Sequence, residues 1–574
     1  MNCRLYLAIL LAAACRPAPP PADLVLVNGK IITVDSTDRI AEAIAVRGDR
    51  IVAVGTTAEV ERLVGKTTRR IDLGGKAVTP GLIDAHAHFL AGGTDRLTQI
   101  DLSHAAVSTI ADVEAKVAAR VAATAKGAWV QGRGWDEGTL TERRLLTAVD
   151  LDRVAPDNPV WLGQTTGHYG VANSVAIRLA RIDRHTKDPP AGTIDRDGSG
   201  NPTGVLKESA QELVTSLIPA PAESLVVRAI GEMARAFNGE GMTGLKDPGI
   251  SSEDWAAYQK ALADSTLTVR VFALWQGGKS MATAERLIAE RAAMSRPYET
   301  TGDDRLISGG IKLYIDGSGG ARTAWLYDEW NKRSTEVDQG NKGYPAANPD
   351  TIRALIKRYH DAGFHISVHS IGDRAIDWTV DSYLAALTAN PLPGRRHGII
   401  HANIPTDRAI DLMAKLQREF DAGYPEPSPA FTWWIGDTYA GNFGPARSAR
   451  LNPFKTFERK GIRWAGSSDF NVTPFPARYG IWAAVAREPL LGVYGKDAFG
   501  HDESVDVKNA LRAFTINAAH QMFLERKVGS IEVGKYGDLA VWDRDPYSVA
   551  TGDLKEMRCL LTVFNGRVVH DQLR

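Results

Sequence analysis

The feature that most constrains the fold is a regular alternation of short β-branched runs with stretches of helical period along the middle of the chain. Runs such as "LTVRVFALW", "GGIKLYIDG" and "FHISVHSIGD" have the length of strands, and stretches such as "PDTIRALIKRYHDAG" have apolar residues at helical spacing. Strands that are joined through helices pair in parallel, and helices cover both faces of the sheet. About eight such units predict an α/β fold in which the strands close into a (β/α)8 TIM barrel.

The two ends of the chain have a different pattern. Residues 23–79 and 525–574 contain short β-rich runs that are separated by turn signals such as Asn28-Gly29 and Asn565-Gly566. We expect 23–79 to form a small antiparallel unit, and we expect the two terminal segments to pair into one β-sandwich domain.

The barrel is then expected to occupy residues 80–524. Within it, the segment from about 95 to 236 is too long for one strand-helix unit and is rich in Trp, Gly and Pro. We interpret this segment as an insertion near the mouth of the barrel.

Residues 1–22 have the pattern of an export signal that is followed by a Pro-rich tether. Arg4 precedes an apolar run, small residues end that run, and Cys15 follows immediately, which resembles a bacterial lipoprotein signal. We therefore expect an exported protein of the bacterial periplasm that is lipid-anchored at Cys15, with ordinary signal cleavage as the alternative. If Cys3 and Cys15 leave the folded part, Cys559 has no partner for an intramolecular disulfide.

The overall charge gives no support for binding to nucleic acid. The chain has 68 Lys and Arg against 68 Asp and Glu, so no global field attracts a polyanion or an anionic membrane, although a local patch is not excluded. The expected partner is a small molecule, and contact with a membrane is expected only through the lipid anchor. A homodimer is compatible with the sequence.

A cluster of metal-ligating residue types follows one predicted strand. In "GLIDAHAH", Asp84, His86 and His88 alternate along the chain, so that a strand would direct all three side chains to one face. Neutral imidazoles are common zinc ligands. Further polar residues are expected at the C-terminal ends of other predicted strands, where a barrel has its active site: Lys312, His369, His401 and Asp469.

The order of these residues resembles the amidohydrolase superfamily, specifically the amidohydrolase-3 group that includes N-substituted formamide deformylases. The resemblance covers nearly the whole chain, from "VNGKIITVD" and "PGLIDAHAH" through "GRGWDE", "NPTGVLKESA", "GIKLYIDGS" and "HSIGDRA" to "HGIIHAN", "GSSDF" and "GSIEVGKYGDLAVWD". One departure is Ile400, where related sequences often have Glu.

The resemblance implies a centre of two divalent metal ions, with zinc as the expected metal. His86 and His88 would hold one ion, His369 and His401 the other, and Asp469 would bind the first ion and transfer protons. Lys312 would react with carbon dioxide to form a carbamate that bridges the ions. The alternative is that Lys312 pairs with a carboxylate such as Asp316 or Asp247, in which case the site has a single metal ion.

We expect such a centre to hydrolyse a C-N bond of amide type, by attack of a metal-bridging hydroxide on a carbonyl, with Asp469 as the acid and base. Aromatic residues in predicted loops favour a small, aromatic-tolerant substrate. One alternative is a mononuclear deaminase or esterase. Another is an exported binding protein without turnover.

Three further residues are candidates for contact with the substrate. His168 resembles a substrate-facing histidine of the family, and Trp135 lies in a predicted loop near the barrel mouth. His397 precedes His401 by four residues, so it either supports a metal ligand or lies one layer deeper in the barrel. Asp373 is expected to cap the next helix.

Overall fold

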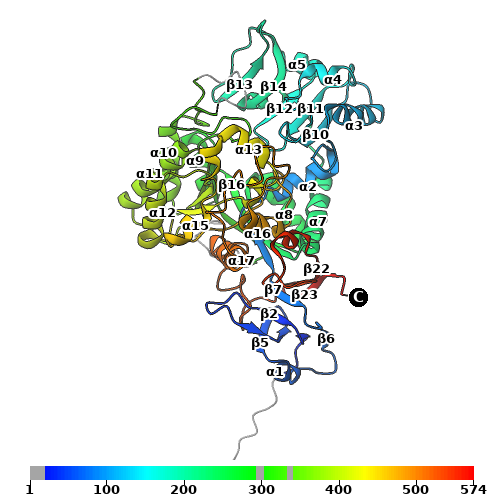
Figure 1. Ribbon diagram of the computed structural model, residues 1–574, viewed down its shortest axis with the longest axis vertical. Helices are drawn as coiled ribbons and strands as arrows, with labels where there is room; N and C mark the ends of the chain where they lie inside the picture. Colours follow the sequence, from blue (N-terminus) through cyan, green and yellow to red (C-terminus); the bar gives the residue numbers. More distant parts are fainter. Residues whose placement is uncertain (1–19, 292–302, 332–339, 574) are drawn as a thin grey trace, which may run out of the picture.

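The computed structural model describes residues 20–291, 303–331 and 340–573. A curled sheet with surrounding helices lies at the centre, a second sheet lies at one end, and two sheets built from the chain termini lie at the other end (Figure 1). The predicted signal, Cys15 and most of the tether lie outside the described residues.

Seven parallel strands form the central sheet. Their order is β20-β19-β18-β17-β16-β15-β8, and each strand pairs in parallel with the next. The strands are β8 (Leu82–Asp84), β15 (Met242–Ile250), β16 (Arg270–Gln276), β17 (Leu306–Tyr314), β18 (Ile366–Ser370), β19 (Gly398–His401) and β20 (Tyr424–Glu426). The sequence predicted β8 and β15 to β19, because parallel strands are buried on both faces and are therefore rich in apolar, β-branched residues; it did not predict β20.

An irregular segment joins the two edges of this sheet. The sequence "GIRWAGSSDF" predicts an eighth strand, but the structure has no regular strand there. The backbone nitrogens of Ala465 and Ser467 nevertheless donate to the carbonyls of Pro425, in β20, and Pro427, just after it, at 3.1 and 3.0 Å. On the other side, Ala85 N donates to Gly466 O at 3.0 Å, next to β8. The segment therefore lies where an eighth strand would lie.

Helices cover the outside of the curled sheet. Apolar strand residues such as Leu245, Val271 and Ile366 share one buried core with helical residues such as Phe237 and Leu355. The helices that follow the strands are α2 (Phe89–Thr98), α7 (Glu223–Gly239), α8 (Ser252–Ala263), α9 (Met281–Arg291), α10 (Pro349–Asp361), α11 (Asp373–Ala389), α12 (Asp407–Phe420), α15 (Phe454–Arg459), α16 (Ala477–Ala486), α17 (Val507–Ala513) and α18 (Ile516–Gln521). Among the described residues, no helix combines the length and the apolar character that a membrane span requires.

A separate six-stranded sheet lies between α2 and α7 in the sequence. Its order is β13-β14-β12-β11-β10-β9. The strands are β9 (Ile100–Asp101), β10 (Val130–Trp135), β11 (Val160–Gln164), β12 (Tyr169–Ala172), β13 (Gly192–Arg196) and β14 (Pro202–Glu208), with the helices α3 (Ile110–Ala122), α4 (Ala148–Asp152), α5 (Ser174–Leu179) and α6 (Glu212–Thr215). We call this region the inserted sheet. It has its own apolar core, and Thr165 Oγ1 donates to Val472 O at 2.8 Å, which connects it to the loop after Asp469.

The termini form two further sheets that share apolar residues. The first has the order β5-β4-β1-β6 and the second β23-β22-β21-β7-β2-β3. The strands are β1 (Leu24–Val27), β2 (Lys30–Ile32), β3 (Ile40–Ala41), β4 (Ala43–Arg47), β5 (Arg50–Gly55), β6 (Arg69–Asp72), β7 (Ala77–Pro80), β21 (Leu539–Trp542), β22 (Cys559–Phe564) and β23 (Arg567–Asp571). Leu26 and Ile44 of the first sheet and Val541 and Val563 of the second belong to one buried cluster.

One expectation for the N-terminal segment was wrong. Residues 23–79 are not purely antiparallel, because β1 pairs with β6 in parallel and β2 pairs with β7 in parallel. The reason is that Asn28-Gly29 carries the chain from one sheet to the other instead of closing a hairpin. Asn565-Gly566 does close a hairpin, because Phe564 pairs with Arg567 and both turn residues have positive φ.

A buried ion pair connects the central sheet to the terminal sheets. Arg270, at the start of β16, donates to both carboxylate oxygens of Asp538, at 2.8 and 3.1 Å, and both side chains are almost fully buried. The guanidinium also lies 4.0 Å from the ring centre of Tyr536. Removing one partner of such a pair leaves an uncompensated buried charge, which is strongly destabilising.

We expect Asp538→Asn to lower the free energy of unfolding by about 3 kcal/mol, because Arg270 would lose its buried counter-charge. Urea unfolding followed by circular dichroism measures the change. Asp49→Asn is the matched control, because the Asp49–Arg50 pair is 3.4 Å long and exposed, and its loss is expected to cost less than about 0.5 kcal/mol. Equal effects of the two substitutions would contradict this prediction.

Candidate metal centre

The first donors lie directly after β8. The strand ends at Asp84, so His86 and His88 belong to the turn that leads into α2 and not to the strand that was expected to carry all three residues. Asp84 accepts hydrogen bonds from His86 N and Ser468 N, both at 3.0 Å. Its carboxylate therefore fixes the backbone on both sides of the site while the two imidazoles face Asp469.

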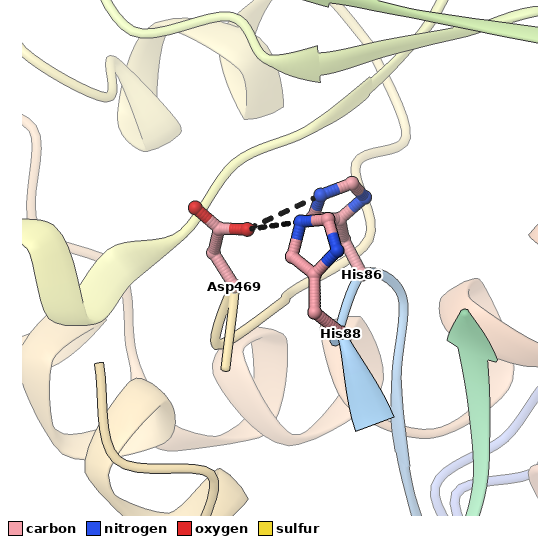
Figure 2. A group of neighbouring side chains, drawn as sticks. All are labelled: His86, His88 and Asp469. Carbon is pink, nitrogen blue, oxygen red and sulfur yellow. Dashed lines mark ion pairs between the residues drawn. The ribbon is translucent and has the colours of Figure 1, made fainter. Parts of the chain in front are cut away.

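His86, His88 and Asp469 converge on a small volume (Figure 2). Asp469 Oδ1 lies 3.2 Å from His86 Nε2 and 3.5 Å from His88 Nε2. One donor atom from each residue lies within 4.8 Å of the others. Asp469 has a φ of +54°, a left-handed conformation that is rare outside glycine and is found most often at functional sites.

A second pair of donors lies on β18 and β19. His369 Nδ1 and His401 Nε2 are 3.1 Å apart, and His369 Nε2 faces Gly317 O at 3.0 Å. His401 Nε2 is also 4.0 Å from the second carboxylate oxygen of Asp469. The two histidine pairs are therefore contiguous, with Asp469 between them.

Lys312 lies beside His86, and the carboxylate that acts on its charge most strongly is Asp469. Its Nζ is 3.4 Å from His86 Nε2, and it forms no ion pair in the part of the chain that the structure describes. The two carboxylates that the sequence offered as partners are engaged elsewhere. Asp316 accepts from the backbone of Trp325, Ile371 and Gly372, and Asp247 accepts from Tyr258 and Leu90.

Burial sets the protonation of these groups. It holds the pKa of His86, His369 and His401 well below the ordinary value and lowers that of His88 to about 3, so all four imidazoles are neutral at pH 7. Burial also lowers the pKa of Lys312 to about 7. Neutral imidazoles have a free lone pair, which is the form that binds a metal ion.

The arrangement fits divalent metal ions. Two ligand atoms on one tetrahedral zinc ion, each at about 2.0–2.1 Å, lie roughly 3.3 Å apart. The His86–Asp469 and His369–His401 separations of 3.2 and 3.1 Å are close to that value. The donors are imidazole nitrogens and a carboxylate, which suit zinc and similar ions. His86, His88 and Asp469 could hold one ion, and His369 and His401 a second.

The three predicted substrate contacts have different positions. His168 lies at the site, because its ring centre is 5.2 Å from that of His369. His397 is buried before the start of β19, where it contacts His360 at 2.9 Å and accepts from Ile366 N at 3.2 Å. Strand β19 therefore separates it from the cluster, in agreement with the deeper of the two positions that the sequence allowed.

Trp135 is not brought to the site either. Its side chain is fully buried in the core of the inserted sheet, where Nε1 donates to Leu162 O at 3.2 Å and the ring packs edge-on against Tyr169. Asp373 is the first residue of α11, next to the N-cap Gly372, and accepts from Tyr327 N at 3.0 Å.

Sequence reasoning missed a buried ion pair beneath the centre. Lys246 Nζ lies 2.6 Å from Glu426 Oε1, both side chains are fully buried, and Ser367 Oγ lies 3.0 Å from the same Nζ. Ser367 and His369 share one face of β18, so the pair lies one layer below the histidines. Glu426 is in register with Ile400 on the neighbouring strand. No sequence motif predicts the Lys246–Glu426 pair, because the two residues lie on strands that are far apart in the sequence.

Comparison with known proteins gives a consistent result. A profile described as the Amidohydrolase family matches residues 69–570. The chain is 30% identical over 562 residues to the N-substituted formamide deformylase of Arthrobacter pascens, which covers 95% of this chain and 97% of that protein. It is 28% identical over 560 residues to the putative amidohydrolase YtcJ of Bacillus subtilis, covering 95% and 99%.

A solved structure has the same fold over nearly the whole chain. The crystal structure of an uncharacterized metal-dependent hydrolase from Pyrococcus horikoshii OT3 superposes with a TM-score of 0.70 at 22% sequence identity. The superposition covers 92% of this chain and 99% of that one.

We expect His88→Ala to lower the bound metal by about one ion per chain, because it removes one donor of a three-donor cluster. Elemental analysis after dialysis against metal-free buffer measures the content. His185→Ala, in an exposed turn of the inserted region, is the control and should leave the content unchanged. Unchanged metal in His88→Ala would rule out this residue as a ligand.

Proposed function

The chain belongs to the amidohydrolase family, and from that premise we propose that it is a binuclear metal-dependent hydrolase that cleaves a C-N bond in a small amide-type substrate. The observation that carries this proposal is the convergence of four neutral imidazoles and Asp469 beside Lys312. We also propose three domain assignments. Residues 80–524 form a (β/α)8 TIM barrel, residues from about 95 to 236 form an insertion near its mouth, and residues 23–79 and 525–574 together form a β-sandwich.

The proposed metal is zinc; His86, His88 and Asp469 would hold one ion and His369 and His401 the other, and a carbamate on Lys312 would add oxygen ligands. The low pKa of Lys312 supports this, because only a neutral amine reacts with carbon dioxide. A second argument is electrostatic, since a lysine cation would repel two divalent ions at this distance. Bound divalent ions supply Lewis-acid chemistry, in which they lower the pKa of a water and polarise a carbonyl.

Asp469 is the proposed acid and base. Its Oδ1 faces His86 and His88, which leaves Oδ2 to hold a proton. Burial raises the pKa of this carboxyl to about 7, so that the group accepts and releases a proton near neutral pH. Asp469 can therefore take a proton from the attacking water and deliver it to the leaving nitrogen.

A cavity beside Asp469 supports a substrate with an apolar substituent. It has a volume of about 400 Å³, and Phe470 and Asn471, which directly follow Asp469, line it together with Arg133, Trp434 and Phe475. Aromatic side chains of this kind bind flat apolar groups. The proposed substrates are therefore small N-substituted amides with an aromatic group. The proposed location is the bacterial periplasm, with a lipid anchor at Cys15.

Metal content per chain, measured together with hydrolysis of aryl amides and N-benzylformamide, tests the proposal. Two metal ions with turnover are the expected result. One ion with turnover favours the mononuclear alternative with an uncarboxylated Lys312. A chain that binds no metal and hydrolyses none of these amides contradicts the proposal and favours a binding protein.

We expect Asp469→Asn to lower kcat by more than about 100-fold, because the amide can neither accept nor deliver the proton. Steady-state kinetics measure the loss, and circular dichroism verifies the fold. Asp407→Asn is the control, because that side chain is 85% exposed and pairs with Arg450 at 2.6 Å. A rate within a few fold of the wild type would disprove the assigned role.

Lys312→Ala is expected to abolish most of the activity, because the ions lose their bridge, and short carboxylic acids are expected to restore part of it. The measurement is the rate as a function of added formate, acetate or propionate. Lys126→Ala, whose side chain is 77% exposed in the wild type, should not respond to these acids. Full activity of Lys312→Ala without any acid would contradict the carbamate.

A further inference from the structure

The cavity beside Asp469 has an aromatic wall. Its lining residues come from α2, from the inserted sheet and from the loop after Asp469. In that loop, the rings of Phe470 and Phe475 lie edge-on with their centres 5.4 Å apart, and Phe475 stacks on Phe237 of α7 at 4.8 Å. The loop therefore presents packed aromatic rings to a bound molecule.

The same cavity is lined by four charged residues: Asp95, Arg96, Asp101 and Arg133. Asp95 accepts hydrogen bonds from Gln99 Nε2 at 2.7 Å and from Asn471 Nδ2 at 2.6 Å. Asp101 is exposed and accepts from Ser103 N at 2.9 Å. Both carboxylates are therefore already hydrogen-bonded within the protein.

Arg133, on β10, has few partners for its donors. Nη2 donates to Thr165 O at 3.3 Å, and Nη1 donates to no residue that the structure describes. Nε is buried without a hydrogen-bond partner there, and it lies 4.0 Å from Asp95 Oδ2, which is too far for a hydrogen bond. A guanidinium has five N–H donors and stays charged in proteins, so most of the donors of Arg133 are unused.

The turn between β11 and β12 leaves the end of this guanidinium uncovered. Gly167 lies against it, and a Cβ at that position would be 3.2 Å from Nη2 and 3.7 Å from Nη1 of Arg133. Gly167 has a φ of +76°, a conformation that favours glycine. A side chain at position 167 would crowd the two terminal nitrogens, and glycine keeps them accessible. The side chain of Arg133 is 22% exposed.

A second arginine adds positive charge to the cavity. The guanidinium of Arg96, on α2, lies 5.8 Å from the ring centre of Phe475, and its Nη1 donates to Met233 Sδ at 3.8 Å. Within the described ranges, neither Arg96 nor Arg133 forms a hydrogen bond to a carboxylate. The cavity therefore combines aromatic rings with two cations that are open to an anion.

These groups lie next to the proposed reaction centre. Asp95 and then Asp469 are the carboxylates whose charges act on Arg133. Phe470 and Asn471, which line the cavity, directly follow Asp469 in the chain. A group that Arg133 binds would therefore lie beside the amide bond that is to be cleaved.

We infer that Arg133 binds a carboxylate of the substrate, and that the substrates are N-acyl derivatives of aromatic amino acids. A carboxylate accepts two parallel hydrogen bonds from one edge of a guanidinium, and Nη1 and Nη2 provide such an edge. In these substrates the carboxylate and the aromatic side chain are attached to the carbon next to the amide nitrogen, so one cavity holds both. Addition of one water across the C-N bond releases a carboxylic acid and an aromatic amino acid. The inference rests on the proposed function and narrows its substrate class.

The first experiment compares two substrates that differ in one charge. N-formylphenylalanine has a carboxylate where N-formylphenylalaninamide has a neutral carboxamide, and formate release measures the rate for both. We expect the wild type to hydrolyse the acid with about 100-fold higher kcat/KM, because the carboxamide leaves the guanidinium without a counter-charge. The ratio should fall below about threefold in Arg133→Gln. It should be intermediate in Arg133→Lys, because an ammonium keeps the charge but not the paired donors.

Arg178→Gln is the matched control, because Arg178 is an exposed arginine of α5 in the inserted region and does not line the cavity. It should keep the ratio of the wild type. Metal content and circular dichroism of each variant are measured in parallel. Loss of metal in Arg133→Gln would overturn the inference, because Arg133 would then stabilise the metal centre. If Arg133→Gln does not fold, the ratios of the wild type and of Arg133→Lys decide the outcome.

The second experiment does not depend on turnover. Calorimetry measures the binding of 3-phenylpropionate and of 3-phenylpropanamide to the metal-loaded protein. We expect the wild type to bind the acid about 10-fold more tightly than the amide, and Arg133→Gln to bind both equally. A preference for the acid that persists in Arg133→Gln would overturn the inference, because the metal centre or Arg96 would then bind the carboxylate.

The inference and the proposed function can fail separately. A wild type that hydrolyses the carboxamide as fast as the acid, or faster, would overturn the inference and leave the proposed function intact. A wild type that hydrolyses neither substrate but binds 3-phenylpropionate through Arg133 would support the carboxylate site and contradict the proposed function. A wild type with neither turnover nor a preference for the acid would overturn both.

Discussion

The candidate centre depends on the parallel pairing of the central strands. Parallel strands have their carboxyl ends on one side of the sheet, so polar residues at those ends converge although they are far apart in sequence. His369 and His401 are 32 residues apart on neighbouring strands, and their facing nitrogens are 3.1 Å apart. The irregular segment before Asp469 completes the arrangement, because its hydrogen bonds to both edges of the sheet place Asp469 beside His86 and His88.

Below the centre, the interior of the sheet is polar, and this constrains the residues above it. Lys246 and Glu426 are both fully buried, and each compensates the charge of the other. Breaking such a pair leaves a buried charge, so neither residue can be lost alone. Lys312 differs, since none of its hydrogen bonds within the described ranges is to a carboxylate, and Asp469 acts on its charge only through space. The contrast between the directly paired Lys246 and the more loosely held Lys312 is in line with the carbamate that we propose on Lys312.

The sequence predicted the parts of the structure that depend on local pattern. Strands β16 to β19 and helix α10 follow from apolar periodicity, and six ligand candidates follow from motifs at strand ends. Local pattern fails where tertiary contacts decide the structure. Trp135 is an aromatic residue in a predicted loop, which suggested a pocket residue, but it is buried in the inserted sheet. The pairing of Lys246 with Glu426 depends on strand register. Glu208 lies 40 residues from His168 in the sequence, and only the pairing of two strands brings the two side chains into contact.

The central sheet and the inserted sheet contribute different groups to the candidate site. The central sheet holds the metal-binding donors, and its polar interior leaves little freedom to change them. The inserted sheet reaches the same site through a single turn at His168 and through Arg133 in the cavity beside Asp469. The turn is held by Glu208, which contacts His168 and also accepts a hydrogen bond from Thr323 in the loop after β17. The position of His168 beside the metal-binding donors therefore depends on how the inserted sheet is attached to the loop after β17.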